Sequence, residues 1–362
     1  MIEKICIENF KSLKNIVIET KHLNLLAGLN GMGKSSFIQV LLLLKQSDGI
    51  TTNGELNLKG RMIEIGKGKD ALFQFASEEY IKLSLFLSNE NTLYWSFHYH
   101  PESELLKSDQ RYPPNMLDEL LTGFQYLSAE RIGPMAMYEA SQQFVDAQNL
   151  GVRGEYAVHF LHVNGNRFKI DKRLKHSQTD ELALMNQVNG WLSEISPGIK
   201  LNVMELPGID KMLLNYQFHL GFGRTNSFKP VNVGFGISYV LSIIICLLVG
   251  KNNSLLIIEN PEAHIHPRGQ VELGKLMALS SSCGTQLFVE THSDHIINGI
   301  RVAVKEKLIH KNDVNVSYFT KKTTIDEQYT EVTEIKVDER GELSEYPKDF
   351  LDEWNNQLLK LV

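Results

Sequence analysis

The sequence predicts an α/β protein in which a doubly wound parallel sheet is joined to an antiparallel β meander. An apolar run, residues 23–27, leads into a glycine-rich segment, residues 28–35, and a helix-like run without Gly or Pro follows. Two nearly continuous apolar runs, residues 254–258 and 286–290, are typical of strands buried on both faces of a parallel sheet. Alternating runs between residues 55 and 99 predict the meander.

Composition sets the broad class of the protein. The 362 residues exceed one average domain, and 43% hydrophobic with 22% charged residues is ordinary for a globular protein. A net charge of −6 argues against a protein coated in nucleic acid, although a local basic groove is compatible with it. Cys6, Cys246 and Cys283 lack metal-ligand spacing, so we expect reduced thiols and a cytoplasmic protein. The apolar segment 240–249 is too short to cross a bilayer, and no membrane partner is expected.

The remaining elements follow in chain order. Residues 2–8 and 15–19 alternate like two strands, and residues 124–129 form a further short strand. After a mostly helical insertion with glycine turns, strand and helix patterns resume, and residues 314–337 alternate again in a small α+β appendage. We therefore expect four segments, 1–138, 139–230 (the insertion), 231–310 and 311–362 (the appendage).

The glycine-rich segment reads G-x-x-x-x-G-K-S, the phosphate-binding P-loop, between a strand and a helix as that motif requires. Its glycines let backbone N–H groups converge on phosphate oxygens, and the helix points its positive end at them. Lys34 would reach the β- and γ-phosphates of ATP, and the Ser35 hydroxyl would ligate Mg²⁺. The predicted nucleotide-binding residues of this loop are Asn30, Gly31, Gly33, Lys34, Ser35 and Ser36.

Three further motifs complete the candidate site. Glu259 ends an apolar strand, where a P-loop NTPase holds its second Mg²⁺ ligand. His292 follows the next strand, where an imidazole could contact the γ-phosphate and sense its loss. Two glycines and a serine stand immediately before a helix and predict a second anion-binding helix N-terminus, made of Gly234, Gly236 and Ser238.

The order of these motifs resembles the ABC-type ATPase heads, which include the SMC, RecF and OLD-nuclease ATPases. Residues 8–12 resemble a segment of those heads that lies near the adenine and ribose, which implies nucleotide contacts for Lys11 and Ser12. Residues 126–134, 259–264 and 290–295 resemble bacterial stand-alone AAA-family ATPases of the OLD/RecF type. Residues 341–354 are similar to the domain of unknown function, DUF3696, at the C-terminus of those proteins.

The resemblance implies a homodimer, or a higher oligomer, held together by ATP. In such heads the P-loop and the strand-end carboxylate of one subunit face the glycine–serine loop of the other, here residues 234–238. A helix N-terminus offered to a γ-phosphate would give the ATP-bound and ADP-bound states different interface energies.

One residue departs from the pattern of ABC heads. Asn260 stands where those heads carry a catalytic Glu, and an amide can orient a water molecule but cannot take its proton. Either Glu262 supplies the base, or turnover is slow and the protein works as an ATP-held switch; low basal ATPase activity is expected. The glutamine lid of the family is also absent, and Glu130 or Arg131 would take its place or form a surface ion pair.

The resemblance points to a switch that controls a separately encoded effector, such as a nuclease, because relatives are frequent in bacterial antiphage systems. The alternative is a RecF-like DNA-repair ATPase that binds DNA directly, and a sensor ATPase with a protein-only partner is a third option. A basic cluster at residues 167–176 could follow a phosphate backbone or be a solvated helix face.

Overall fold

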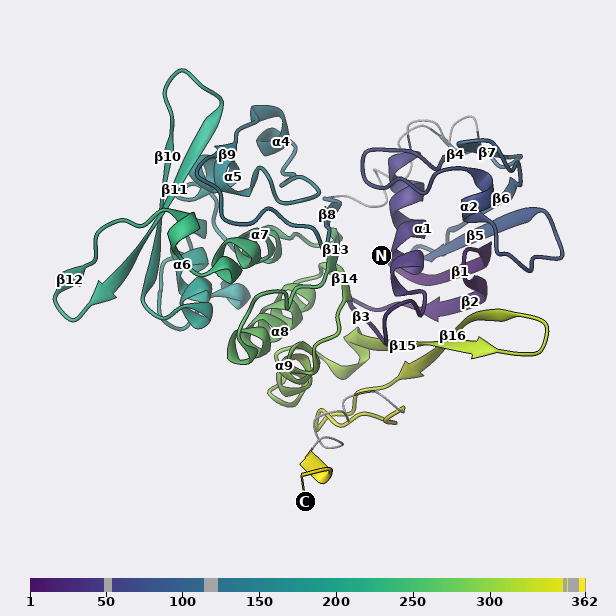
Figure 1. Cartoon of the computed structure of the whole chain (residues 1–362). Coiled ribbons are helices and arrows are strands. Elements are labelled where there is room, and N and C mark those ends of the chain that lie inside the picture. The colour runs from purple at the N-terminus through teal and green to yellow at the C-terminus, as the bar shows by residue number, and fades with distance from the viewer. Residues whose placement is uncertain (49–53, 114–122, 348–349, 351–357, 362) are drawn as a thin grey trace. The chain divides into compact units, whose positions relative to one another are not determined.

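The computed structural model describes residues 1–48, 54–113, 123–347, 350 and 358–361. It divides into two compact units (Figure 1). The first unit comprises Met1–Thr122, Val314–Asp338 and Leu343–Val362, and the second comprises Gly123–Asp313 and Glu339–Glu342. The tail belongs to the first unit because one of its strands pairs with a strand near the N-terminus. Part of the DUF3696-like segment, residues 348–349 and 351–354, lies outside the described residues.

A six-stranded antiparallel sheet forms one layer of the first unit. Inward-facing side chains alternate along its strands, as at Ile81, Leu83 and Leu85, so one face is buried and the other is partly exposed. The predicted meander is confirmed. The strands, in spatial order, are β2 (Leu13–Glu19), β1 (Ile2–Phe10), β5 (Tyr80–Leu87), β6 (Thr92–His98), β7 (Leu105–Ser108) and β4 (Glu55–Asn57).

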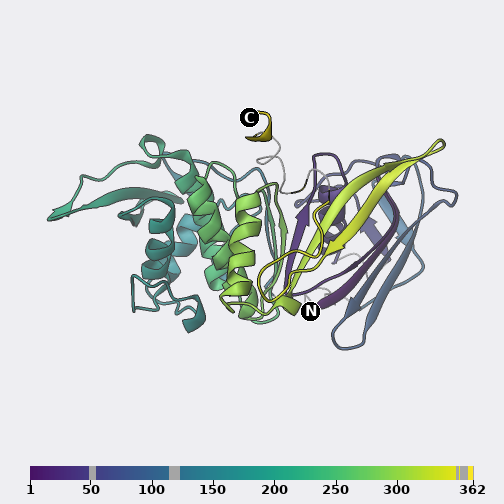
Figure 2. The ribbon, with the colours of Figure 1, turned by 90° about the horizontal axis from the view of Figure 1, so that it is seen from below.

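The P-loop of the first unit lies between β3 (Leu23–Ala27) and α1 (Lys34–Gln46). All five residues of β3 are buried, and β3 runs parallel to β15 (Val314–Thr323). Strand β15 pairs in turn with β16 (Gln328–Ile335), and Figure 2 shows the two as a long yellow ribbon. The short helix α2 (Gly68–Ala71) completes this unit. The predicted order of strand, glycine loop and helix is confirmed.

The second unit contains three parallel strands, β8 (Gln125–Leu127), β13 (Leu255–Glu259) and β14 (Gln286–Glu290), with β13 in the middle. Because successive strands run the same way, their carboxyl ends meet at one edge. Helices α8 (Pro267–Ser282) and α9 (Asp294–Lys305) pack side by side, as Figures 1 and 2 both show. Helix α7 (Phe235–Val249) is buried over nearly its whole length, as its apolar composition predicts.

The insertion contains α-helices only as far as Ile195. The helices α4 (Gln142–Asp146), α5 (Ala157–Asn164) and α6 (Leu184–Ile195) precede the hairpin of β10 (Ile199–Glu205) and β11 (Lys211–Leu220). Residues 212, 214 and 216 are buried and the residues between them are not, which is the period of a strand. The expectation of a mostly helical insertion is therefore wrong for this part. The remaining pieces are β9 (Tyr138–Glu139), β12 (Gly223–Arg224) and 3₁₀ turns at Lys172–Leu174, Pro230–Asn232 and Lys311–Asp313.

No helix within the described part of the chain is long and apolar enough to cross a membrane.

Candidate functional site

The P-loop packs closely against the strands of the tail in the first unit. Gly28 has φ +132°, and a Cβ there would lie 2.3 Å from the carbonyl oxygen of Phe319 on β15. Gly33, the N-cap of α1, has φ +104°, and a Cβ there would lie 2.4 Å from Oγ1 of Thr330 on β16. Both positions therefore require glycine, for the left-handed backbone and for the close approach.

Lys34 fixes the interior of the loop. Its side chain is only 3% exposed, and its Nζ donates hydrogen bonds to the carbonyl oxygens of Gly28 (2.8 Å) and Leu29 (2.9 Å). Asn30, Gly31 and Ser35 are exposed, whereas Ser36 is half-buried. The first turn of α1 contains no acidic residue, so its positive end is compatible with a phosphate group.

Lys11 and Ser12 stand beside the start of α1. Lys11 Nζ donates to Gln39 Oε1 (2.8 Å), and burial lowers the pKa of this lysine. Ser12 is held by Thr330, whose backbone N–H donates to the Ser12 carbonyl (2.8 Å) and whose Oγ1 lies 2.9 Å from Ser12 Oγ. The same Oγ1 lies 2.9 Å from the carbonyl oxygen of Met32 in the loop.

Sequence reasoning missed Thr330. It stands almost 300 residues after the P-loop, in a strand whose pattern shows only that it is a strand. The pairing of β16 with β15, and of β15 with β3, brings it to the loop. No local signal could have identified it.

The second unit gathers the predicted carboxylates at the carboxyl ends of β13 and β14. Glu259 ends β13 opposite Glu290 of β14, and its Oε2 accepts a hydrogen bond from the backbone N–H of Ala129 (3.1 Å). A second hydrogen bond comes from the Tyr126 hydroxyl. Burial raises the pKa of Glu259, because desolvation disfavours its charged form. A nearby cation would favour the charged form again.

Glu262 joins the turn after β13 to the end of β14. One carboxylate oxygen accepts from the Thr291 hydroxyl and the other from the backbone N–H of His292, both at 2.8 Å. The structure thus brings Glu259, Glu262 and His292 to the same strand ends, with Asn260 in the intervening turn.

Arg131 does not form a surface ion pair, which was one of the two roles expected for it. Its side chain is only 2% exposed and donates to the carbonyl oxygens of Ser128 (2.7 Å), Glu259 (2.6 Å) and Asn260 (2.6 Å). The expectation is wrong for Arg131 because these strand-end carbonyls take all three donated bonds. Glu130 does form a surface pair, with Arg153 at 3.4 Å.

The second predicted anion site is placed differently from the sequence expectation. Helix α7 begins at Phe235, so Gly236 and Ser238 lie inside the helix rather than before it. Ser238 is buried, and its Oγ lies 3.3 Å from the Tyr216 hydroxyl. Gly234, the N-cap, and Phe235 are exposed at this helix end.

The donor set is compatible with Mg²⁺ bound together with a nucleotide. Across the described ranges no cluster of three or more His, Cys, Asp or Glu side chains could hold a metal ion. Mg²⁺ takes oxygen ligands and usually binds through one or two protein groups plus phosphates and water. Ser35 and Glu259 are oxygen donors of that kind.

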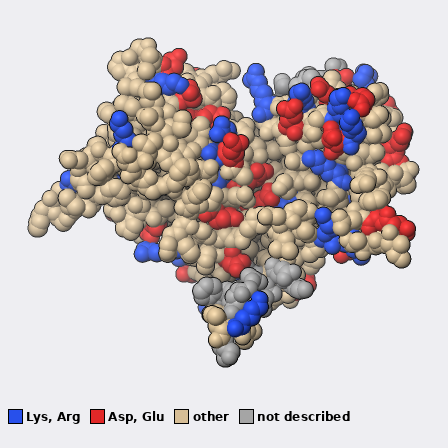
Figure 3. All heavy atoms as spheres, viewed as in Figure 1, with Lys and Arg blue, Asp and Glu red and all other residues tan. Residues whose placement is uncertain are grey.

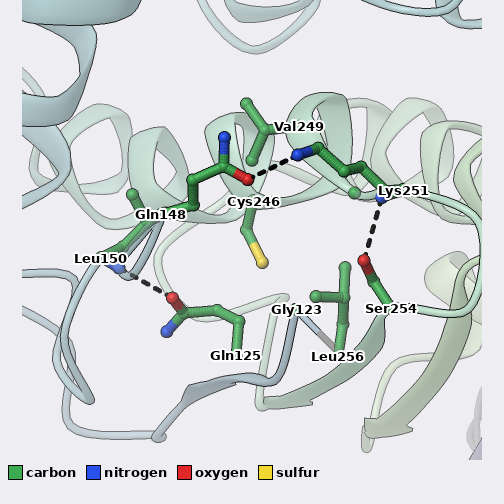
Figure 4. A pocket seen from close by; sticks show the side chains of 10 residues that line it. Gly123, Gln125, Gln148, Leu150, Cys246, Val249, Lys251, Ser254 and Leu256 are labelled. Atoms are coloured by element: carbon green, nitrogen blue, oxygen red, sulfur yellow. Dashed lines mark hydrogen bonds between the residues drawn. The ribbon is translucent and has the colours of Figure 1, made fainter. Parts of the chain in front are cut away.

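The small pocket of the second unit drawn in Figure 4 is a different place. It holds about 40 Å³ and lies at the amino ends of β8 and β13, near Gly123 and Ser254. Two of its lining residues, Gln148 and Lys251, are joined by a 2.8 Å hydrogen bond. Its volume suits a water molecule rather than a nucleotide.

Three family models together match most of the chain. Residues 1–91 match "AAA ATPase domain", residues 135–298 match "AAA domain, putative AbiEii toxin, Type IV TA system", and residues 309–361 match "Protein of unknown function (DUF3696)". Among curated proteins, none is similar enough to count as a match.

Solved structures of SMC heads share the fold. The SMC head bound to the C-terminal winged-helix domain of ScpA is 14% identical with a TM-score of 0.59, over 93% of this chain and 98% of that chain. An SMC head with an extended coiled coil, bound to the C-terminal domain of ScpA derived from Pyrococcus furiosus, is 14% identical with a TM-score of 0.52, over 99% of both chains. At this identity the likeness concerns the fold alone.

Proposed function

We propose that this chain works as an ATP-held switch. The premise is that it is an AAA-family ATPase with an SMC-type head fold and a C-terminal DUF3696 region. The observation that carries the proposal is the P-loop, preformed by the two hydrogen bonds of Lys34. A loop that is already closed around its own lysine needs little ordering when a phosphate group arrives.

Each half of the chain supplies part of the chemistry. In the first unit, Gly31, Gly33 and Lys34 would bind the phosphates, with Lys11 and Ser12 beside the nucleoside. In the second unit, Glu259 would be a Mg²⁺ ligand, as Ser35 would be in the first, and His292 would sense the γ-phosphate. When bound, Mg²⁺ neutralises charge that develops on the phosphate oxygens.

The side chains proposed to face the attacking water support slow turnover. The Asn260 amide cannot accept a proton, and its Oδ1 is buried without a hydrogen-bond partner among the described residues. Glu262 is a carboxylate, but each of its oxygens already accepts one hydrogen bond. Positioned phosphates and an incompletely activated water still permit hydrolysis, at a low rate.

A second copy of the chain is the partner that we propose for the exposed end of α7. A Cβ at Gly234 would have no other atom within 4 Å, and Phe235 is 49% exposed. An N-terminus of this kind can contact the γ-phosphate of a nucleotide held by another subunit. ATP would then hold a homodimer that controls a separately encoded effector, such as a nuclease, in antiphage defence. Three free thiols agree with a cytoplasmic setting.

The test combines two variants with one control. Lys34→Ala should abolish ATP binding and ATP-dependent association, measured by light scattering after size-exclusion chromatography. Glu262→Gln should bind ATP and remain associated, because hydrolysis is blocked. Lys107→Ala, which alters an exposed strand lysine, should behave like the wild type. ATP-dependent association that survives in Lys34→Ala would refute the ATP-held dimer.

Direct DNA binding is the second candidate, and the surface gives it little support. In the basic cluster, Arg173 pairs with Asp171 (2.7 Å), Lys175 pairs with Asp180 (2.8 Å), and His176 is buried. On the face in Figure 3, basic and acidic side chains are interleaved. A filter-binding assay with and without ATP decides the question: tight, salt-sensitive DNA binding without a partner would favour the repair function.

A further inference from the structure

The Arg131 guanidinium is a buried cation held by carbonyl groups. Its Nη1 bonds the carbonyls of Ser128 and Glu259, and its Nη2 bonds that of Asn260. Its Nε is also buried and has no hydrogen-bond partner among the described residues. Removing a charge from water is unfavourable, and burial lowers the pKa of Arg131 to about 10. A cation in this place must be fixed by the groups that surround it.

Those groups belong to the backbone that carries the candidate catalytic residues. Asn260 has φ +43°, a left-handed conformation that is uncommon outside glycine but that asparagine adopts more readily than most residues. Besides the Arg131 bond, its N–H donates to the Glu290 carbonyl (2.8 Å), and its carbonyl accepts from the N–H of Ala263 (3.2 Å). The planar fork of Arg131 is the one side chain that holds both Glu259 and Asn260 in the described structure.

The same guanidinium contacts helix α7, which begins at the exposed Phe235. Its Cζ lies 5.5 Å from the centre of the Tyr239 ring on α7. The Tyr239 and Phe235 rings lie 4.9 and 4.8 Å from that of His264, which follows the Asn260 turn. A continuous set of side-chain contacts thus joins the end of β13 to the N-terminal turn of α7.

We propose that Arg131 is a positioning residue for ATP hydrolysis. It fixes the backbone of Glu259 and Asn260. The Glu259 carboxylate is thereby oriented for Mg²⁺ and the Asn260 amide for the water molecule. It also connects this turn to α7. The inference rests on the proposed ATPase switch. Arg131 itself donates only to backbone carbonyls, so its effect reaches the reaction through Glu259 and Asn260.

The test compares Arg131→Lys with Arg131→Met. Lysine keeps the charge but loses the fork, so both variants should lower kcat about 10- to 100-fold, the usual loss when a residue behind a metal ligand is changed. The Mg²⁺ concentration for half-maximal activity should rise, whereas the affinity for a fluorescent ATP analogue, which depends on the P-loop, should change less than about twofold. Arg153→Met, at an exposed arginine paired with Glu130, is the matched control.

Hydrogen exchange of the nucleotide-free protein provides a readout that does not depend on hydrolysis. The amide of Ala263, bonded to Asn260, should exchange faster in both Arg131 variants and at the wild-type rate in Arg153→Met. Wild-type kcat and Mg²⁺ dependence in Arg131→Lys would overturn the proposal, as would unchanged exchange. If either variant fails to fold, Tyr239→Leu provides a substitute, because it removes the aromatic ring next to the guanidinium. This variant should also show a smaller kcat, and an unchanged kcat would overturn the proposal. A wild-type protein that binds but never hydrolyses ATP would refute the ATPase mechanism, while the exchange rates would still decide whether Arg131 fixes the turn.

Discussion

Replacing Thr330 by valine tests whether the tail strand β16 holds the P-loop in its working shape. The change exchanges a hydroxyl for a methyl group at a site that is only 2% exposed. It removes the two 2.9 Å contacts of Oγ1, with Ser12 Oγ and with the carbonyl of Met32, and leaves the backbone bond to Ser12 in place. Leaving a buried polar partner unsatisfied costs about 1–3 kcal/mol, so the free energy of unfolding should fall by about 2 kcal/mol.

Part of that loss should appear as weaker nucleotide binding, because the loop would have to be ordered when ATP binds. About 1 kcal/mol of lost preorganisation corresponds to a roughly fivefold weaker affinity for ATP. Urea unfolding and titration calorimetry measure the two effects. Thr330→Ser keeps the hydroxyl and should keep the affinity, and Thr333→Val, farther along β16, should also leave it unchanged. The reasoning is refuted if Thr330→Val binds ATP like the wild type, or if Thr330→Ser weakens binding equally.

Three other changes have definite expected results. Burial raises the folded-state pKa of Glu259 above its unfolded value, so the contribution of this carboxyl group to stability declines as pH rises from about 4 through the raised pKa. Glu259→Gln should remove that decline, measured by urea unfolding at a series of pH values. A variant whose free energy of unfolding still falls with pH as steeply as that of the wild type would contradict the argument. Glu262→Gln should retain ATP but fail to convert it in single-turnover assays, whereas wild-type conversion would exclude Glu262 as the base. Gly28→Ala should lower the free energy of unfolding by about 1–3 kcal/mol because Gly28 has a positive φ. Gly234→Ala should change it little, because a Cβ there would meet no atom within 4 Å. Equal losses in the two variants would contradict the strain argument.

The parts of the fold set by local pattern could be predicted from the sequence. Strand β3, the P-loop and strand β14 begin and end where the apolar runs and glycines indicate. The sequence does not predict the β10–β11 hairpin, although its buried residues alternate, because the helical pattern before it suggests a longer helical segment. The start of α7 was placed too late, since Gly236 resembles a helix boundary in sequence. In the structure, a Cβ at Gly236 would lie 2.1 Å from the His264 carbonyl, so this glycine serves packing inside the helix.

The residues that support the candidate site could not be predicted, because each acts through contacts distant in sequence. Arginine is rarely buried, and neither role expected for Arg131, the lid position or a surface ion pair, involves burial beneath a turn. Its burial follows from three carbonyls that meet only when β8 and β13 are paired. Thr330 is comparable, since its partners Ser12 and Met32 come from the opposite end of the chain. The sequence motifs thus predict the residues that would contact ATP, but not Arg131 and Thr330, which fix the backbone around those residues.

The arrangement of Glu262 favours it over Asn260 as the group that receives the proton from water. Each carboxylate oxygen can accept two hydrogen bonds, so the bonds from Thr291 and His292 leave acceptor capacity for a water molecule. The same two bonds prevent Glu262 from turning toward a water molecule without moving the end of β14. Proton transfer therefore requires either a water in one fixed place or a displacement of the segment that carries His292. Since His292 is the proposed γ-phosphate sensor, hydrolysis and sensing would depend on the same backbone segment, which suits a switch that holds ATP until its surroundings move that segment.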